Sequence, residues 1–199
     1  MKWPMPAAEM VDNSLSRTLS FQFDQFSLRW KFDIDAEERS YPGYAVLAEE
    51  LVHRFAEFVK VVDDTSENTV SVNGCGCRYT NTLADIGASR WLASFLLVDG
   101  INGSLDDANY YGFKVQRDDT MDGFRRSVSL QMDAGRAQFP EIDISAVAVP
   151  AEGAEVVELE PQATARNLLD AAHALQNQAF ESGFNSEMKK KWGLNRDGS

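Results

Sequence analysis

The chain has 199 residues, of which 44% are hydrophobic and 25% are charged, and this composition excludes disorder throughout. No apolar run approaches the roughly 20 residues of a membrane span, and the N-terminus has no apolar signal region. We therefore expect a cytoplasmic protein that makes no membrane contact. The formal net charge of −12 argues against direct nucleic-acid binding and suits a basic protein partner.

The acidity is concentrated in one part of the chain. Residues 99–160 carry 13 acidic and 5 basic side chains, whereas residues 161–199 carry 4 acidic and 5 basic ones. The acidic middle is therefore the predicted contact face for a partner. The alternative is that the acidity only keeps the protein soluble.

The first third of the sequence predicts an arm, a strand region and a helix. Residues 1–14 lack periodicity and predict a flexible arm. Apolar and polar residues then alternate as far as Trp30, but the phase changes at Asp24-Gln25, which indicates either a bulge or two strands with a tight connection. The segment from Ser40 to Gly43 is typical of a helix entry. The apolar stripe of the helix that follows consists of Leu47, Leu51, Phe55, Phe58, Val59 and Val62.

The middle of the sequence predicts a strand and a long loop. The strand runs from Val70 to Tyr79, with a bulge at Asn73-Gly74 where its phase shifts. Residues 90–98 fit a helix or a strand, and residues 99–109 predict a loop. Cys75 and Cys77 are expected to be reduced thiols, because a disulfide at this spacing would be strained. With only two histidines in the chain, neither a metal site nor a cofactor is predicted.

The last third predicts three antiparallel strands and a helix. The strands span residues 110–117, 124–133 and 141–149, joined by short polar links that suit hairpins. Thr164 is a candidate N-cap for an amphipathic helix whose apolar residues include Leu168, Ala172, Leu175 and Ala179. This order predicts an α+β fold, a mainly antiparallel sheet with two long amphipathic helices packed on one face. The predicted domain spans residues 15–194, and residues 195–199 form a disordered tail.

Four segments carry a resemblance to a known family. They are FQFDQFSLRW (Phe21 to Trp30) with YPGY (Tyr41 to Tyr44), the Phe-rich helix after it, CRYTN (Cys77 to Asn81), and LLDAAHALQNQAF followed by SEMKKKWG. Together they resemble a sporadically distributed bacterial family of unassigned function. Its patchy distribution implies genes on mobile elements, with phage-defence or toxin–antitoxin loci as one natural home. The residues that match its motifs are Trp30, Tyr41, Pro42, Tyr79, Asn81, His173, Trp192 and Gly193.

His173 leads the candidate functional residues, because an imidazole exchanges protons near neutral pH, although a packed core histidine is the plainer interpretation. Asp170, three residues earlier, could orient it, and a dyad of Cys77 with His173 is a remote alternative. The candidate pocket between the sheet and the last helix comprises Trp30, Tyr41, Tyr79, Asn81, Asp170, His173 and Trp192.

Three functions remain open on these residues. The first is a non-enzymatic interaction protein that binds and regulates a partner protein, with a homodimer as a further expectation. The second is a small-molecule-binding module that uses the candidate pocket. The third is an enzyme with His173 as its general base, although the sequence offers no accompanying nucleophile motif.

Overall fold

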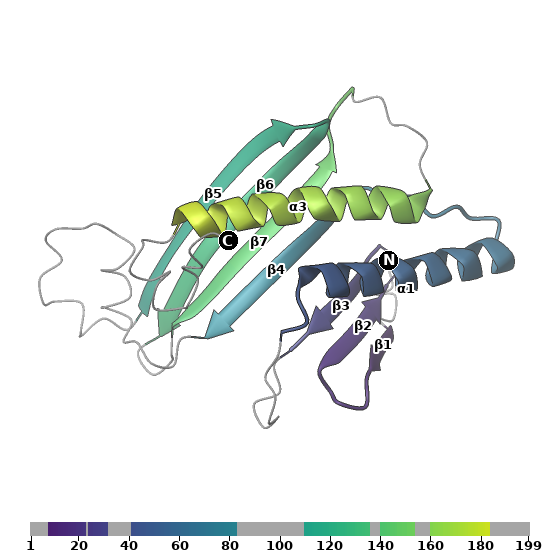
Figure 1. The fold of residues 1–199 in the computed structure, drawn as a ribbon, viewed down its shortest axis with the longest axis horizontal. Helices are drawn as coiled ribbons and strands as arrows, with labels where there is room; N and C mark the ends of the chain where they lie inside the picture. Colours follow the sequence, from purple (N-terminus) through teal and green to yellow (C-terminus); the bar gives the residue numbers. More distant parts are fainter. Residues whose placement is uncertain are drawn as a thin grey trace, which may run out of the picture. The chain divides into compact units, whose positions relative to one another are not determined.

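The computed structural model describes residues 8–22, 24–31, 41–82, 110–135, 140–153 and 160–183. The described residues form an α+β structure with antiparallel sheets and two helices, which confirms the predicted α+β class (Figure 1). It divides into two compact units, Met1–Val72 with Leu159–Arg166, and Asn73–Glu158 with Asn167–Ser199. The described strands form two separate sheets, one in each unit, where the sequence predicted a single sheet.

The sheet of the first unit contains three short strands in the order β1-β2-β3. These are β1 (Ala8–Val11), β2 (Arg17–Phe21) and β3 (Phe26–Trp30). Residues 8–11 were expected to belong to a flexible arm, and they instead pair with β2, with Met10 opposite Leu19. A strand of four residues is too short to show a clear alternation, so its pairing partner rather than its own pattern defines it.

The phase change in the Phe-rich segment is a hairpin. Phe21 at the end of β2 lies opposite Phe26 at the start of β3, and the Gln22 N–H donates a 2.7 Å hydrogen bond to the Gln25 carbonyl. Of the two predicted alternatives, two strands with a tight connection is therefore correct. The reversal explains the phase change, because each strand keeps its own alternation toward the same face.

Helix α1 (Tyr44–Thr65) packs against this small sheet. It begins directly after Gly43, at the end of the segment that was predicted to be a helix entry. Gly43 has a φ of +89°, which suits a residue without a Cβ. Phe55 and Phe58 of the predicted stripe contact Phe21 and Phe26 of the sheet, and the ring centroids of the contacting pairs are 5.4–5.9 Å apart. These rings form the centre of the first unit, where Ala48, Phe55 and Val59 are buried.

The sheet of the second unit has four strands in the order β4-β7-β6-β5. They are β4 (Cys75–Thr82), β5 (Tyr110–Met121), β6 (Phe124–Gly135) and β7 (Glu141–Pro150). The last three form the predicted run of antiparallel strands, and β4 pairs with β7 rather than with its sequence neighbour. Strand β4 begins at Cys75, so the segment from Val70, with its predicted bulge, lies before the strand.

The link between β5 and β6 is a two-residue turn. Asp122 and Gly123 have φ values of +52° and +78°, and Met121 lies opposite Phe124. Two positive φ values in an Asp-Gly pair define a type I′ turn, which matches the twist of the flanking strands. Strand β5 therefore extends to Met121, beyond the predicted end at Arg117.

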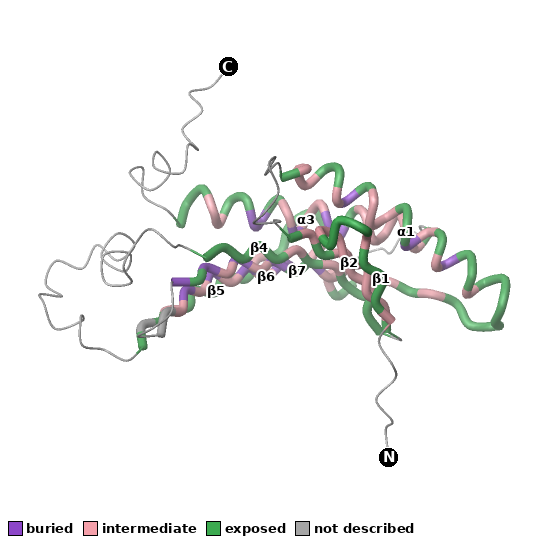
Figure 2. Tube along the Cα trace, turned by 90° about the horizontal axis from the view of Figure 1, so that it is seen from below, coloured by how far each residue is buried: buried purple, intermediate pink, exposed green. Residues whose placement is uncertain are grey.

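Helix α3 (Pro161–Gly183) crosses one face of the four-stranded sheet (Figures 1 and 2). It begins at Pro161, three residues before the predicted N-cap Thr164, because proline fits the first helical position, where no N–H is needed. The buried apolar residues of this layer alternate along β6 and β7 and follow helical spacing on α3. They are Val128, Leu130, Met132, Ile142, Ile144, Ala146, Ala148, Leu168, Leu169, Ala172 and Leu175.

Some predicted features lie outside the described residues. They are the element at residues 90–98, the loop at residues 99–109, the residues Trp192 and Gly193, and the tail at residues 195–199. Within the described ranges, neither helix is apolar enough over a sufficient length to cross a membrane.

Candidate functional site

The aromatic residues proposed for a pocket lie in different parts of the fold. Trp30 ends β3, and its ring meets Tyr41 edge-on with centroids 5.3 Å apart, so these two do pack together in the first unit. Tyr79 and Asn81 belong to β4 in the second unit. Trp192, the third member of the expected aromatic cluster, is outside the described residues.

Tyr79 and Asn81 share one face of β4, because successive odd-numbered residues of a strand point the same way. They lie opposite Ile144 and Ile142 of β7, whose side chains are buried on the face that α3 covers. Burial raises the pKa of the Tyr79 hydroxyl, which is therefore protonated at neutral pH. On this strand Tyr79 and Asn81 are suited to packing and hydrogen bonding rather than to proton transfer.

His173 lies on α3, half-buried, with Asp170 one turn earlier. Burial lowers the pKa of the imidazole, and the nearby Asp170 carboxylate opposes that shift. The ring nitrogen Nδ1 is 3.5 Å from the Asn177 side-chain amide nitrogen. Because its pKa is lowered, His173 is mainly neutral at pH 7. Its ring is partly buried and lies beside the Asn177 side chain on the same helix.

The most buried polar contact beneath α3 involves Gln176, which the sequence analysis did not select. Its Nε2 donates a 2.7 Å hydrogen bond to the backbone carbonyl of Ile144, and its Oε1 accepts one of 3.1 Å from the Cys77 thiol. Gln176 therefore ties the helix to two adjacent strands at once. The sequence does contain a signal for this contact. Gln176 lies four residues after Ala172 and so falls on the apolar stripe of the helix, where a polar side chain needs a hydrogen-bond partner.

Both cysteines are free, and neither is a good nucleophile. Burial raises the pKa of Cys75 to about 11 and that of Cys77 to about 12, so both remain thiols at neutral pH. The Cys77 thiol donates its hydrogen bond to the Gln176 side chain.

A half-buried ion pair stabilises the turn end of the β5–β6 hairpin, with the arginine buried and the aspartate partly exposed. Arg126, only 7% exposed, contacts Asp119 through Nε–Oδ1 and Nη2–Oδ2, both at 2.8 Å. These hydrogen bonds hold the pKa of the Asp119 carboxyl below its usual value. Residue 119 was expected to lie in the short polar link after Arg117, and Asp119 is instead part of β5.

Other acidic residues of the middle segment also have partners within the sheet. Asp143 accepts hydrogen bonds from Arg78 and Thr80, and Asp133 accepts one from the Tyr110 hydroxyl. The Asp143 carboxylate therefore has a charged partner in Arg78, whereas the acidic contact face as a whole stays a prediction.

Strand β5 is an open edge of the four-stranded sheet. Among the described strands its only neighbour is β6, and the pairing continues without a bulge from Tyr110 to Met121. Its apolar side chains are unusually accessible: Tyr110, Val115 and Met121 are 62%, 57% and 52% exposed. A long, regular and partly apolar edge offers unpaired backbone groups to another chain.

A shallow hollow lies between this edge and the C-terminal end of α3. Its volume is about 220 Å³, and the lining is mainly apolar, with Arg117 as its one charged residue. The described lining residues are Phe113, Val115, Arg117, Val128, Leu130, Ala179, Ser182 and Gly183. None of them belongs to the predicted pocket. The Arg117 guanidinium is directed to Gln178, with Nη2 2.7 Å from its Oε1.

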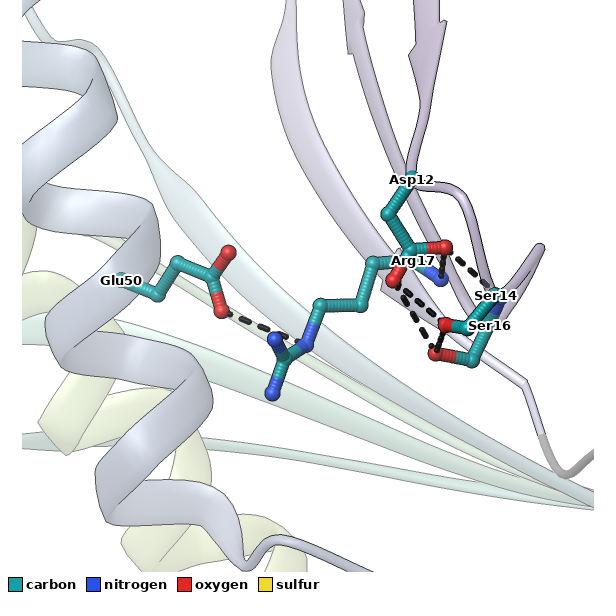
Figure 3. Close-up of polar contacts among 5 residues, drawn as sticks. All are labelled: Asp12, Ser14, Ser16, Arg17 and Glu50. Carbon is teal, nitrogen blue, oxygen red and sulfur yellow. Dashed lines mark hydrogen bonds and ion pairs between the residues drawn. The ribbon is translucent and has the colours of Figure 1, made fainter.

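A polar network organises the β1–β2 connection of the first unit (Figure 3). Asp12 accepts backbone hydrogen bonds from Ser16 (2.9 Å) and Arg17 (3.1 Å), and its other oxygen accepts from the Ser14 and Ser16 hydroxyls. These bonds lower the pKa of the Asp12 carboxyl. Arg17 continues to α1 through a 3.4 Å ion pair between Nε and Glu50. The network has a structural explanation and does not require a ligand.

No family model, curated protein or solved structure matches this chain. The resemblance to the sporadic bacterial family remains a prediction from its motifs. Within the described ranges, no three His, Cys, Asp or Glu side chains converge in a way that would hold a metal ion.

Proposed function

We propose that this chain is a non-enzymatic interaction protein that binds and regulates a partner protein. The observation that supports this most strongly is the open edge of β5. It presents 12 residues of regular strand with three exposed apolar side chains and one paired neighbour among the described strands. An extended segment that adds to such an edge gains main-chain hydrogen bonds, while alternate side chains give specificity.

The backbone pattern supports strand addition at this edge. Residues that flank a two-residue turn form a hydrogen-bonded pair, so Met121 and every second residue before it bond to β6. The even-numbered residues from Tyr110 to Thr120 therefore direct their N–H and C=O groups away from β6. These groups are unmatched by any described strand and are available to another chain.

The chemistry of the interior supports a non-enzymatic role. Thiols with pKa values of about 11 and 12 are poor nucleophiles, and the lowered pKa of His173 reflects burial. The net charge of −12 suits a basic partner, with a toxin or nuclease encoded nearby as the expected example in a defence or toxin–antitoxin locus.

The test is isolation of the tagged full chain from its native host, followed by native mass spectrometry. Gln116→Pro removes an outward N–H of β5 without taking a hydrogen bond from the β5–β6 ladder. Gln116→Ala is the matched control, because it trims the side chain and keeps the N–H. We expect a stoichiometric protein with the wild type and the Ala variant, and its loss with the Pro variant. Equal capture by all three would show that β5 is not the contact.

The hollow beside α3 favours a second candidate, a small-molecule-binding module. Its apolar lining with the Arg117 guanidinium fits an apolar molecule that carries a carboxylate. A bound small mass in native spectra, lost in Ala179→Phe and weakened in Arg117→Gln, would support this function. A wild-type chain that retains no such mass after gentle purification would count against it.

A further inference from the structure

We infer that the edge of β5 pairs with the same edge of a second copy of this chain, antiparallel and centred on Gln116. The inference goes beyond the proposed function, since it assigns the β5 edge to a second copy, with which a partner protein would compete for the same backbone groups. The two copies of the strand would be related by a two-fold axis that passes between them at Gln116. A residue on one side of Gln116 then lies opposite the residue of the second copy that is equally far from Gln116 on the other side.

The charges of β5 favour this centre. With Gln116 opposite its own copy, Lys114 lies opposite Asp118 of the second copy, and the symmetry produces this pair twice. Directly opposed residues on one face of an antiparallel pair have Cβ atoms about 4.5–5.5 Å apart, which is within reach of a salt bridge. Self-pairing at Gln116 therefore places unlike charges together at two positions.

Neither charge has a partner among the described residues. No ion pair or hydrogen bond of Lys114 or Asp118 occurs there, in contrast to Asp119 on the same strand. They are four residues apart on one strand, which separates their Cα atoms by about 13 Å, too far for a direct contact. Their directly opposite neighbours on β6 are Gln131 and Ser127, both neutral, whereas Asp133 and Arg125 lie diagonally on the same face and make no ion pair with them. A second copy supplies directly opposed charges, which β6 does not.

Neighbouring centres are less favourable. A two-fold axis at Lys114, Arg117, Asp118 or Asp119 would place identical charges opposite each other. An axis at Val115 avoids this but leaves Lys114 opposite the neutral Gln116 and gains no charge pair. Among the centres near the middle of the strand, Gln116 alone combines outward backbone groups with two opposite-charge pairs and no opposed like charges.

The other face of the pair also gains cover. Val115, which is 57% exposed, would lie opposite Arg117 of the second copy, whose aliphatic stem can pack against it. Both residues line the hollow beside α3, so the second copy would border that hollow. The two four-stranded sheets would then form one continuous sheet, and an exposed edge would become an interior pair.

The test measures the mass of the purified full chain by sedimentation equilibrium over a range of micromolar concentrations at low salt. We expect a dimer. Lys114→Glu alone and Asp118→Lys alone should each raise the dimer dissociation constant about tenfold, because two attractive pairs become repulsive. The double variant Lys114→Glu with Asp118→Lys should restore the wild-type value. Lys60→Glu on α1, an exposed control of the same charge change, should leave it unaltered.

Separate outcomes overturn separate statements. A wild-type chain that stays monomeric, or a Gln116→Pro variant that still dimerises, overturns the β5 dimer. A dimer whose charge variants have no effect, or whose double variant is not restored, overturns the Gln116 centre. A monomeric wild type that captures a host protein only when the β5 edge is intact would overturn this inference and leave the proposed function standing. A β5 dimer that captures no host protein would overturn the proposed function and leave this inference standing.

Discussion

The guanidinium of Arg126 and the carboxylate of Asp119 face each other across the β5–β6 pair, joined by two hydrogen bonds of 2.8 Å. Arg126 occupies a position on the buried face of β6, in line with Val128, Leu130 and Met132. An arginine at such a position requires a partner, because burying an unpaired charge is costly. Asp119 provides that partner from the adjacent strand.

We therefore expect Asp119→Asn to lower the free energy of unfolding by about 1–3 kcal/mol, since Arg126 loses a charged acceptor. The measurement is urea denaturation at pH 7. Asp64→Asn, at the exposed end of α1, is the control and should change stability by less than about 0.5 kcal/mol. Equal stability of the two variants would mean that water already satisfies Arg126.

Gln176 gives a second prediction, because it is buried and uses both ends of its amide. Gln176→Leu should cost about 1 kcal/mol, since it loses hydrogen bonds but keeps the volume. Gln176→Glu should cost about 2–4 kcal/mol at pH 7, because a carboxylate would face the Ile144 carbonyl without an N–H to donate. The difference between the two variants should shrink toward pH 4, as the introduced acid becomes protonated. A Glu variant as stable as the Leu variant at pH 7 would contradict the described contact.

The cysteines give a third prediction. With pKa values of about 11 and 12, Cys75 should react with iodoacetamide at pH 8 roughly a hundredfold, and Cys77 roughly a thousandfold, more slowly than an unfolded cysteine. The rate should rise on unfolding in urea, where both thiols regain their ordinary pKa. Mass spectrometry of the alkylated chain resolves the two sites. Rapid labelling of the native protein would show that β4 is more accessible than the structure indicates.

Asp12 gives a prediction for pH. Its folded-state pKa is lowered, chiefly by the Arg17 backbone N–H and the Ser14 hydroxyl. Its contribution to stability is therefore present above the unfolded value near 3.8 and is lost as the pH falls through the lower folded value. Asp12→Ala should be less stable than the wild type at pH 6, and the difference should narrow below pH 4. The comparison is thermal unfolding of both proteins from pH 2 to pH 7. A difference that is constant with pH would mean that the carboxylate charge plays no part.

Local patterns predicted the elements whose signals lie within a few residues. The alternation in β6 and β7, the apolar stripe of α1 and the hairpin between β5 and β6 each follow from neighbouring side chains and backbone preferences, although the two-residue turn at Asp122 and Gly123 was not singled out. The phase change between Phe21 and Phe26 indicated an interruption of the strand, but it was compatible with either a hairpin or a bulge.

The features that sequence reasoning missed depend on residues far apart in the chain. Gln176 meets Cys77 across 99 residues, and Arg78 meets Asp143 across 65, so no local pattern relates them. Asp119 was placed in the predicted link between residues 117 and 124, and its partner Arg126 lies seven residues later on the next strand. The division of the strands into two sheets likewise depends on which strands pair, which side-chain alternation does not encode.

The pairing of β4 with β7 has a consequence for how the chain folds during synthesis. Thr82 ends β4 and pairs with Glu141, so roughly 60 further residues must be made before β7 is available. At about 5–20 residues per second, β4 leaves the ribosome several seconds ahead of its partner. The β5–β6 hairpin, closed by a two-residue turn, can form in that interval, and β7 then adds to β6. Strand β4 and its two cysteines therefore stay unpaired until the β5–β6–β7 sheet has formed. Helix α3 is synthesised after all the described strands and then packs over them.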